Sequence, residues 1–297
     1  MTDVDNIDFT FSDTIAGYVT SFDDDSDSFG IRTSDGRAFT ASLTTNTFAS
    51  GVRNFGEDYV DRTGQMRDML QPERFVFVYG VFYSEVGGHR FEVKQMIFPT
   101  NERNEFAFEK PDWWVNQARA VADFYLRGQF PDGKYDWNNY RTKLSLSGMH
   151  TPDYVAPDYR QETDTISRLI YGLASTYLLT GEDRFLEAAE AGVEYLRDNL
   201  RGTDEAEGVV FWYHAIDRSA TSERKIYASS FGDDYDAIPM YEQIYALAGP
   251  TQTFRITGDQ RILSDIDKTV KLFDHFFRDY EKGGYFSHVD PVTFSPR

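Results

Sequence analysis

The fold of the carboxyl-terminal half is decided by two copies of one pattern, Tyr177-Leu-Leu-Thr-Gly-Glu-Asp-Arg-Phe-Leu186 and Phe254-Arg-Ile-Thr-Gly-Asp-Gln-Arg-Ile-Leu263. In each copy an apolar helical pattern ends at Thr-Gly, and a new one begins after the acidic residue that follows. Glycine readily takes the left-handed conformation that ends a helix, and an acidic residue favours the start of the next one. Because the connector repeats together with the helical pattern, the sequence predicts stacked helical hairpins joined by tight turns.

The same helical spacing extends over five segments and predicts an all-α half. The helices are expected at residues 111–128, 163–180, 183–200, 239–257 and 259–280. At the other end of the hairpins the connectors are long, residues 129–162 and 201–237. Since function concentrates on long loops carried by a rigid scaffold, this long-loop face is where we expect the site.

The first hundred residues follow a period of two. Alternating apolar runs, which predict strands, lie at residues 15–22, 29–32, 38–43, 75–83 and 89–98. Residues 52–70 carry a looser helical pattern. Three strands, a helix and two strands is an order similar to that of a small OB-type barrel. We therefore predict an α+β multidomain chain, with an OB-like β-barrel at 1–100 and a helical domain at 111–297.

Composition excludes several classes of function. The 297 residues include 30 Lys and Arg against 49 Asp and Glu, a net charge of −19, which disfavours nucleic-acid binding by either domain. There is no Cys, no apolar run of about eighteen residues and no basic leader, so we expect a cytoplasmic protein without a membrane span. Phosphate-binding glycine loops, His-Glu-x-x-His and EF-hand spacings are also missing, so we expect neither cofactor nor metal.

The long loops are rich in aromatic rings and carboxylates, a mixture that suits a carbohydrate. They hold Trp137, Tyr140, His150, Tyr154, Tyr159, Trp212, Tyr213, His214, Asp233, Asp234, Tyr235 and Asp236. Any single ring of this kind is more often part of a core. Arg168 and Tyr241 are expected one turn into two helices on the same side. A buried Arg facing a cavity can fix a substrate oxygen, although an Arg is more often part of a structural ion pair.

Beside the two Thr-Gly links, two further stretches carry a family resemblance: Tyr241-Glu-Gln-Ile-Tyr-Ala-Leu-Ala248 and Gly283-Gly-Tyr-Phe-Ser-His-Val-Asp290. Together they resemble the N-acylglucosamine 2-epimerase family, which includes cellobiose 2-epimerases and ketose–aldose isomerases. The resemblance covers about Trp113 to Arg297 and implies a portion of an (α/α)6 barrel. It also implies that Arg168 and Tyr241 match the family's active-site Arg and Tyr on inner helices.

The chain departs from the family pattern because it shows five helices where the barrel has twelve. We therefore expect the amino-terminal portion of such an enzyme. The histidines that these enzymes use as general acid and base match none of the five in this chain, which leaves the catalytic residues unknown. The residues expected to bind substrate are Arg168, Tyr241, Trp137, Trp212, His214, Gln243 and His288.

Three functions remain open. The first is a sugar 2-epimerase or aldose–ketose isomerase that moves the C2 proton. The second is an inverting glycoside hydrolase, whose carboxylate pair would come from Glu162, Asp164, Asp233, Asp234 and Asp236. The third is a non-catalytic carbohydrate-binding or partner-binding fragment. In that case an open barrel edge on the last helix would drive self-association through Leu263, Ile266, Val270, Phe273 and Phe277.

Overall fold

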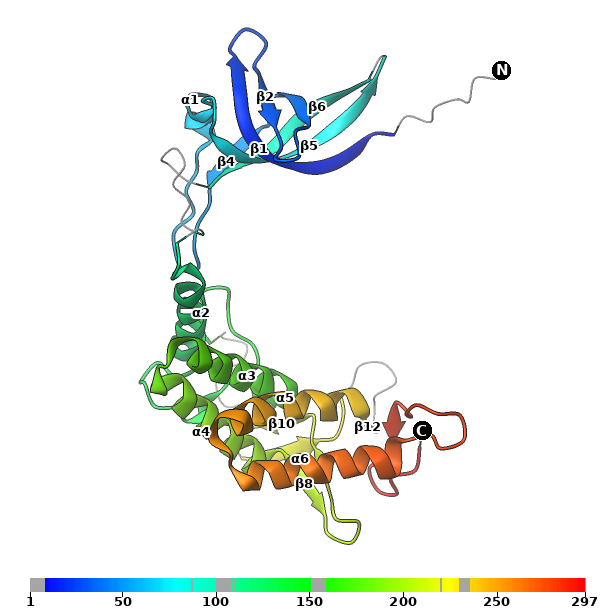
Figure 1. Cartoon of the computed structure of the whole chain (residues 1–297). Helices are drawn as coiled ribbons and strands as arrows, with labels where there is room; N and C mark the ends of the chain where they lie inside the picture. Colours follow the sequence, from blue (N-terminus) through cyan, green and yellow to red (C-terminus); the bar gives the residue numbers. More distant parts are fainter. Residues whose placement is uncertain are drawn as a thin grey trace, which may run out of the picture. The chain divides into compact units, whose positions relative to one another are not determined.

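The computed structural model of the chain describes residues 9–86, 88–99, 108, 110–150, 159–219, 221–229 and 236–296. It divides into two compact units, Met1–Gln117 and Ala118–Arg297 (Figure 1). In the described part of the chain, no helix is long and apolar enough to cross a membrane.

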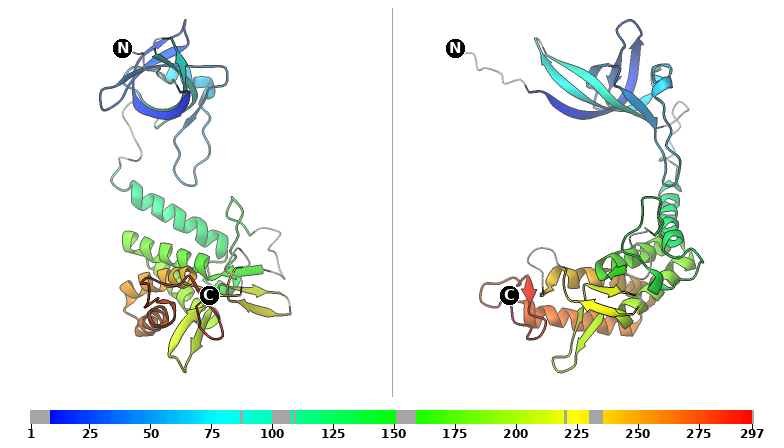
Figure 2. Two further views of the ribbon diagram at one scale, coloured as in Figure 1. Left: turned by 90° about the vertical axis from the view of Figure 1, so that its right-hand side faces the viewer. Right: turned by 180° about the vertical axis from the view of Figure 1, so that it is seen from behind.

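The first unit is a small β-barrel, as predicted. Its strands are β1 (Phe11–Asp23), β2 (Ser28–Arg32), β3 (Ala38–Ser42), β4 (Phe48–Gly51), β5 (Phe75–Glu85) and β6 (Gly88–Phe98). They follow the order β3-β2-β1-β5-β6, and a parallel pairing of β3 with β6 closes the ring, while β4 extends the same edge of β6 (Figure 2). Alternate residues of each strand point inward, and the core includes Val19, Ile31, Val78 and Val93.

The predicted helix at residues 52–70 is wrong over most of its length. Only η1 (Thr63–Gln65) and α1 (Met66–Met69) are helical. The residues before them fold back beside β4, because the Gly51 amide donates to the Val60 carbonyl at 2.9 Å and the Arg62 amide donates to the Ala49 carbonyl at 2.8 Å. The apolar spacing that suggested a longer helix comes from Met66 and Leu70, which are buried in the barrel core.

The helical hairpins are confirmed with nearly the predicted limits. The helices are α2 (Trp113–Gln129), α3 (Thr163–Thr180), α4 (Asp183–Asn199), α5 (Met240–Thr257) and α6 (Gln260–Leu272), which continues into a π-helical turn, Phe273–Phe277. Gly181 ends α3 at φ 70° and Gly258 ends α5 at φ 68°, both left-handed. Each Thr-Gly link therefore closes a tight hairpin, α3 with α4 and α5 with α6.

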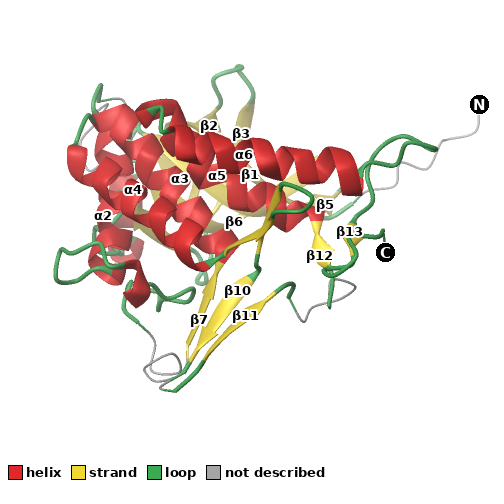
Figure 3. Ribbon diagram, turned by 90° about the horizontal axis from the view of Figure 1, so that it is seen from below, coloured by secondary structure: helices red, strands yellow, loops and turns green. Residues whose placement is uncertain are grey.

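The expectation of an all-α half is wrong, because the long connectors form β structure (Figure 3). One sheet has three antiparallel strands, β7 (Tyr159–Glu162), β10 (Ala215–Arg218) and β11 (Glu223–Ile226). Two further pairs are β8 (Arg201–Asp204) with β9 (Val209–Trp212), and β12 (Ile238–Pro239) with β13 (His288–Val289). These strands have two to four residues each, which is too short for an alternating pattern to be recognised.

The last helix does not present the continuous apolar flank that was expected. Phe277 is fully buried in a small core with Leu272 and Val289, and Ile266 packs against the main core of the unit. Of the expected stripe, Val270 is exposed. Self-association of the chain stays a prediction.

Candidate functional site

Helices α3 and α5 pack in parallel, which places their amino-terminal ends on one side of the unit. The Ser167 hydroxyl near the start of α3 donates to the Ala246 carbonyl at 3.0 Å and accepts from the Gly249 amide at 2.9 Å. Eight residues later on α3, the Ser175 hydroxyl accepts from the Gln252 side-chain amide Nε2 at 3.0 Å. A Cβ atom at Gly249 would lie 2.5 Å from the Ser167 carbonyl oxygen, so the close approach of the two helices requires glycine there.

Gly249→Ala is expected to lower the free energy of unfolding by about 1–3 kcal/mol, because the added methyl group forces α3 and α5 apart. Gly172→Ala is the matched control, since a Cβ on this exposed α3 glycine meets nothing within 4 Å. That change is expected to be neutral or to stabilise by up to about 1 kcal/mol. Urea denaturation of both variants measures the difference, and equal effects would contradict the packing described here.

Arg168 and Tyr241 reach the same surface through a third residue, Tyr245. The Arg168 guanidinium lies 5.3 Å from the centre of the Tyr245 ring, and that ring meets Tyr241 edge-on at 6.3 Å. All three are open to solvent: the Arg168 side chain is 55% exposed, Tyr241 46% and Tyr245 44%. We call Arg168, Tyr241 and Tyr245 the aromatic platform.

Arg168 is exposed and not buried facing a cavity, which corrects the expected burial of this residue; its role in binding stays a prediction. Its guanidinium forms an ion pair with Asp164, four residues earlier on the same face of α3. An ion pair of this kind is the structural role that the sequence analysis considered more common for an arginine. The ion pair also holds the guanidinium beside the Tyr245 ring, so the same contact that stabilises α3 keeps the Arg168 side chain at the exposed surface.

A buried imidazole–carboxylate pair lies at the same helix ends. His214 and Glu242, 8% and 6% exposed, are joined by a hydrogen bond between His214 Nδ1 and Glu242 Oε1. Glu242 belongs to the first turn of α5, and the Thr163 amide at the start of α3 donates to the His214 carbonyl at 2.8 Å. Burial acts to lower the pKa of His214, but the hydrogen bond and charge of Glu242 outweigh it, so the pKa is raised from 6.5.

Three of the predicted substrate-binding residues lie in the core. Trp137 and Trp212 are fully buried, and their indole N–H groups donate to the Ala188 carbonyl and to Thr269 Oγ1, each at 3.1 Å. Gln243 is fully buried and binds the backbone of Trp212 in both directions, accepting from its amide at 2.7 Å and donating to its carbonyl at 2.9 Å. These contacts fasten β9 and the loops to the helices.

His288 lies beside the start of α5, because its strand β13 pairs with β12 and puts it opposite Pro239. It is partly exposed, and its Nδ1 is 2.8 Å from Ser287 Oγ. Of the carboxylates considered for hydrolysis, Glu162 and Asp164 flank the first residue of α3, whereas Asp233 and Asp234 lie outside the described residues. Over the described ranges, no three His, Asp or Glu side chains are grouped to hold a metal ion.

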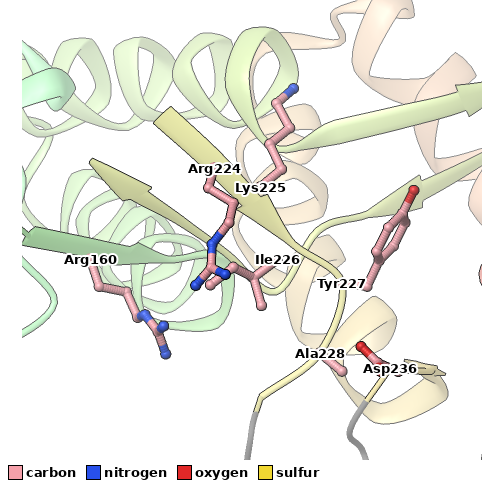
Figure 4. Close-up of a pocket in the computed structure, with 7 residues that line it drawn as sticks. All are labelled: Arg160, Arg224, Lys225, Ile226, Tyr227, Ala228 and Asp236. Carbon is pink, nitrogen blue, oxygen red and sulfur yellow. The ribbon is translucent and has the colours of Figure 1, made fainter. Parts of the chain in front are cut away.

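Two adjoining cavities lie over the β7–β10–β11 sheet. Of the residues that line them, Tyr159 and Asp236 were named from the sequence, but none of the arginines was. One, of about 230 Å³, is lined by Arg160, Arg224, Lys225, Ile226, Tyr227, Ala228 and Asp236 (Figure 4). The other, of about 380 Å³, is lined by Tyr159, Arg160, Asp217, Arg218, Ser219, Ser222 and Arg224. Because β7 leads directly into α3, these cavities belong to the long-loop face.

Comparison with known proteins gives distant structural similarities. No family model and no curated protein matches the sequence. The cellobiose 2-epimerase of Bacillus thermoamylovorans B4167 is similar with a TM-score of 0.48 at 14% identity, over 64% of this chain and 45% of that one. The cellobiose 2-epimerase of Spirochaeta thermophila DSM 6192 has a TM-score of 0.39 at 13% identity, over 61% of this chain and 42% of that one. A family 76 glycoside hydrolase (mannosidase) of Bacteroides thetaiotaomicron VPI-5482 has a TM-score of 0.33 at 14% identity, over 46% of this chain and 32% of that one.

These neighbours are carbohydrate-active enzymes. The chain spans less than half the length of each of them.

Proposed function

We propose that the chain binds a carbohydrate on the aromatic platform and supplies the sugar-positioning part of a sugar 2-epimerase or aldose–ketose isomerase. The observation that carries the proposal is the contact series Arg168–Tyr245–Tyr241, exposed at the paired ends of two parallel helices. Exposed phenol rings stack on the apolar faces of sugars, and a guanidinium fork donates to hydroxyl and carbonyl oxygens.

Each platform residue has a separate role in the proposal. Tyr245 supports the sugar ring or chain, Tyr241 closes one side of it, and Arg168 donates to an oxygen near C1 or C2. The chemical step is removal of the C2 proton by a base within hydrogen-bond reach, followed by return of a proton to the opposite face. The resemblance assigns those proton transfers to histidines that this chain does not match, so positioning is the part proposed for the residues described here.

Tyr245→Ala is expected to weaken sugar binding at least tenfold, or about 1.4 kcal/mol, because it removes the ring that joins Arg168 to Tyr241. Tyr245→Phe keeps the ring and is expected to retain most of the affinity. Tyr280→Ala is the control, as it removes an exposed tyrosine whose ring contacts Arg278 and not the platform. Titration calorimetry with cellobiose, glucose and mannose measures the affinities, and equal losses in Tyr245→Ala and Tyr280→Ala would contradict the assignment.

The chemical step is tested separately with the same sugars in heavy water. Deuterium incorporation at C2 supports epimerase or isomerase chemistry. Release of the aglycone from chromogenic glycosides would instead support the hydrolase alternative, since an epimerase releases none. Sugar binding that depends on Tyr245 without either reaction would leave a carbohydrate-binding function.

A further inference from the structure

The β7–β10–β11 sheet has a small excess of cations in a chain whose net charge is −19: Arg160, Arg218, Arg224 and Lys225 stand against Glu162, Asp217 and Glu223. Asp217 of β10 lies opposite Arg160 of β7 on one side and opposite Arg224 of β11 on the other. Residues that face each other across antiparallel strands point to the same side of a sheet. The two guanidinium groups therefore share one face, and Figure 4 shows them extending toward the same space.

Asp217 orients both arginines. Arg160 donates through Nε and Nη2 to the two Asp217 oxygens, at 2.6 and 2.9 Å, and Arg224 Nη2 lies 3.3 Å from Oδ2. The hydrogen bond from Arg160 lowers the pKa of Asp217, so its carboxylate stays ionised and keeps the guanidinium groups in place. The Arg224 side chain is 75% exposed, which leaves most of its donors facing solvent.

The two cavities are lined mainly by cationic and polar side chains, and each lining also includes one carboxylate, Asp236 in the smaller cavity and Asp217 in the larger. Both are lined by Arg160 and Arg224; the larger adds Arg218 and the smaller adds Tyr227. Lys225 extends to the other side of its strand, over the Tyr213 ring at 5.1 Å (Figure 4). Volumes of about 230 and 380 Å³ approach or reach the roughly 300–1,000 Å³ of small-molecule sites.

We propose that Arg160 and Arg224 bind the oxyanion of an acidic monosaccharide unit, either a uronate carboxylate or a sugar phosphate. Guanidinium forks match the geometry of both oxyanions, and they are hydrated more weakly than an ammonium group. Tyr227 offers an aromatic ring to the sugar in the same cavity. This inference rests on the proposed carbohydrate function and specifies its substrate class, an acidic sugar instead of a neutral one.

The test compares anionic and neutral ligands on the full chain. Titrations use glucuronate, glucose 6-phosphate, inorganic phosphate and glucose with the wild type, Arg224→Gln and Arg127→Gln. Arg127 is an exposed arginine in the last turn of α2 and serves as the matched control. The wild type and the control are expected to prefer glucuronate or glucose 6-phosphate to glucose by at least tenfold, and Arg224→Gln is expected to remove that preference.

The two sources of the anion give different results, because a uronate site favours glucuronate and a phosphate site favours glucose 6-phosphate. Equal affinity for glucose and for both acidic sugars, or a preference that survives Arg224→Gln, would overturn the proposal. Inorganic phosphate binding as tightly as glucose 6-phosphate would overturn the carbohydrate part. The two proposals fail by different results. The proposed function fails if Tyr245→Ala leaves sugar binding unchanged, and the anion site fails if Arg224→Gln leaves the preference for acidic sugars unchanged.

Discussion

His214→Leu is expected to lower the free energy of unfolding by about 3–5 kcal/mol, the typical cost of removing one partner of a buried ion pair. His214 and Glu242 are both buried and hydrogen-bonded to each other at the start of α5. Without the imidazole, the Glu242 carboxylate loses that partner in a region that water does not reach. Urea denaturation of the wild type and the variant measures the loss.

The double variant His214→Leu/Glu242→Leu separates the lost charge pair from lost packing. Removing both partners of a buried pair is often neutral or stabilising, so the double variant is expected to be more stable than His214→Leu alone. If the double variant is instead less stable than His214→Leu by about the cost of the Glu242→Leu truncation, the two residues contribute independently through packing and not as a charge pair.

The same pair gives stability a pH dependence of defined sign. The pKa of His214 is raised in the folded protein above its unfolded value of 6.5, so the protonated imidazole contributes fully below pH 6.5. That contribution is lost as the pH rises through the folded pKa. The free energy of unfolding of the wild type should therefore fall relative to that of the double variant as the pH is raised from 6 upward. A difference that stays constant with pH would contradict a charged His214.

Regular elements could be predicted from the sequence because their signals are local. The helices of both hairpins follow from apolar spacing of three and four residues, and their ends follow from Gly181 and Gly258. Five barrel strands, β1, β2, β3, β5 and β6, follow from alternating apolar runs of four residues or more, whereas the four-residue strand β4 was not predicted. The segment at 52–62 could not be predicted, because its course depends on hydrogen bonds from Gly51 and Arg62 to partners eight or more residues away.

The candidate site was only partly predictable, because some of its contacts join residues that are far apart in the sequence. Arg168 and Tyr241 were predicted from motif position alone, and in the structure both contact Tyr245. Arg160 and Arg224 are 64 positions apart in the sequence, and strand pairing with Asp217 is what brings them together. A four-residue strand carries too little pattern to predict that pairing. The charged residues of β10 and β11 are consecutive, Asp217-Arg218 and Glu223-Arg224-Lys225, so they give no alternating signal for the pairing.

Trp137→Ala is expected to lower the free energy of unfolding by about 3–5 kcal/mol, the typical range for truncating a buried tryptophan. Trp137 is fully buried, with Phe130 and Tyr140 ring centres at 5.2 and 5.4 Å. It packs so closely on α4 that a Cβ at Gly192 would lie 2.7 Å from the indole ring. The truncation leaves a cavity where three aromatic rings now meet.

Trp137→Phe distinguishes this core role from the substrate-binding role suggested by the sequence. Phenylalanine keeps most of the packing but cannot donate to the Ala188 carbonyl, so a smaller loss of about 1–3 kcal/mol is expected. Because the indole is covered by protein on all sides, sugar affinity of the folded Trp137→Phe variant should equal that of the wild type. A tenfold loss of sugar affinity at nearly unchanged stability would instead show that the ring meets the ligand, and would move the binding surface from the aromatic platform toward the loop at 137–140.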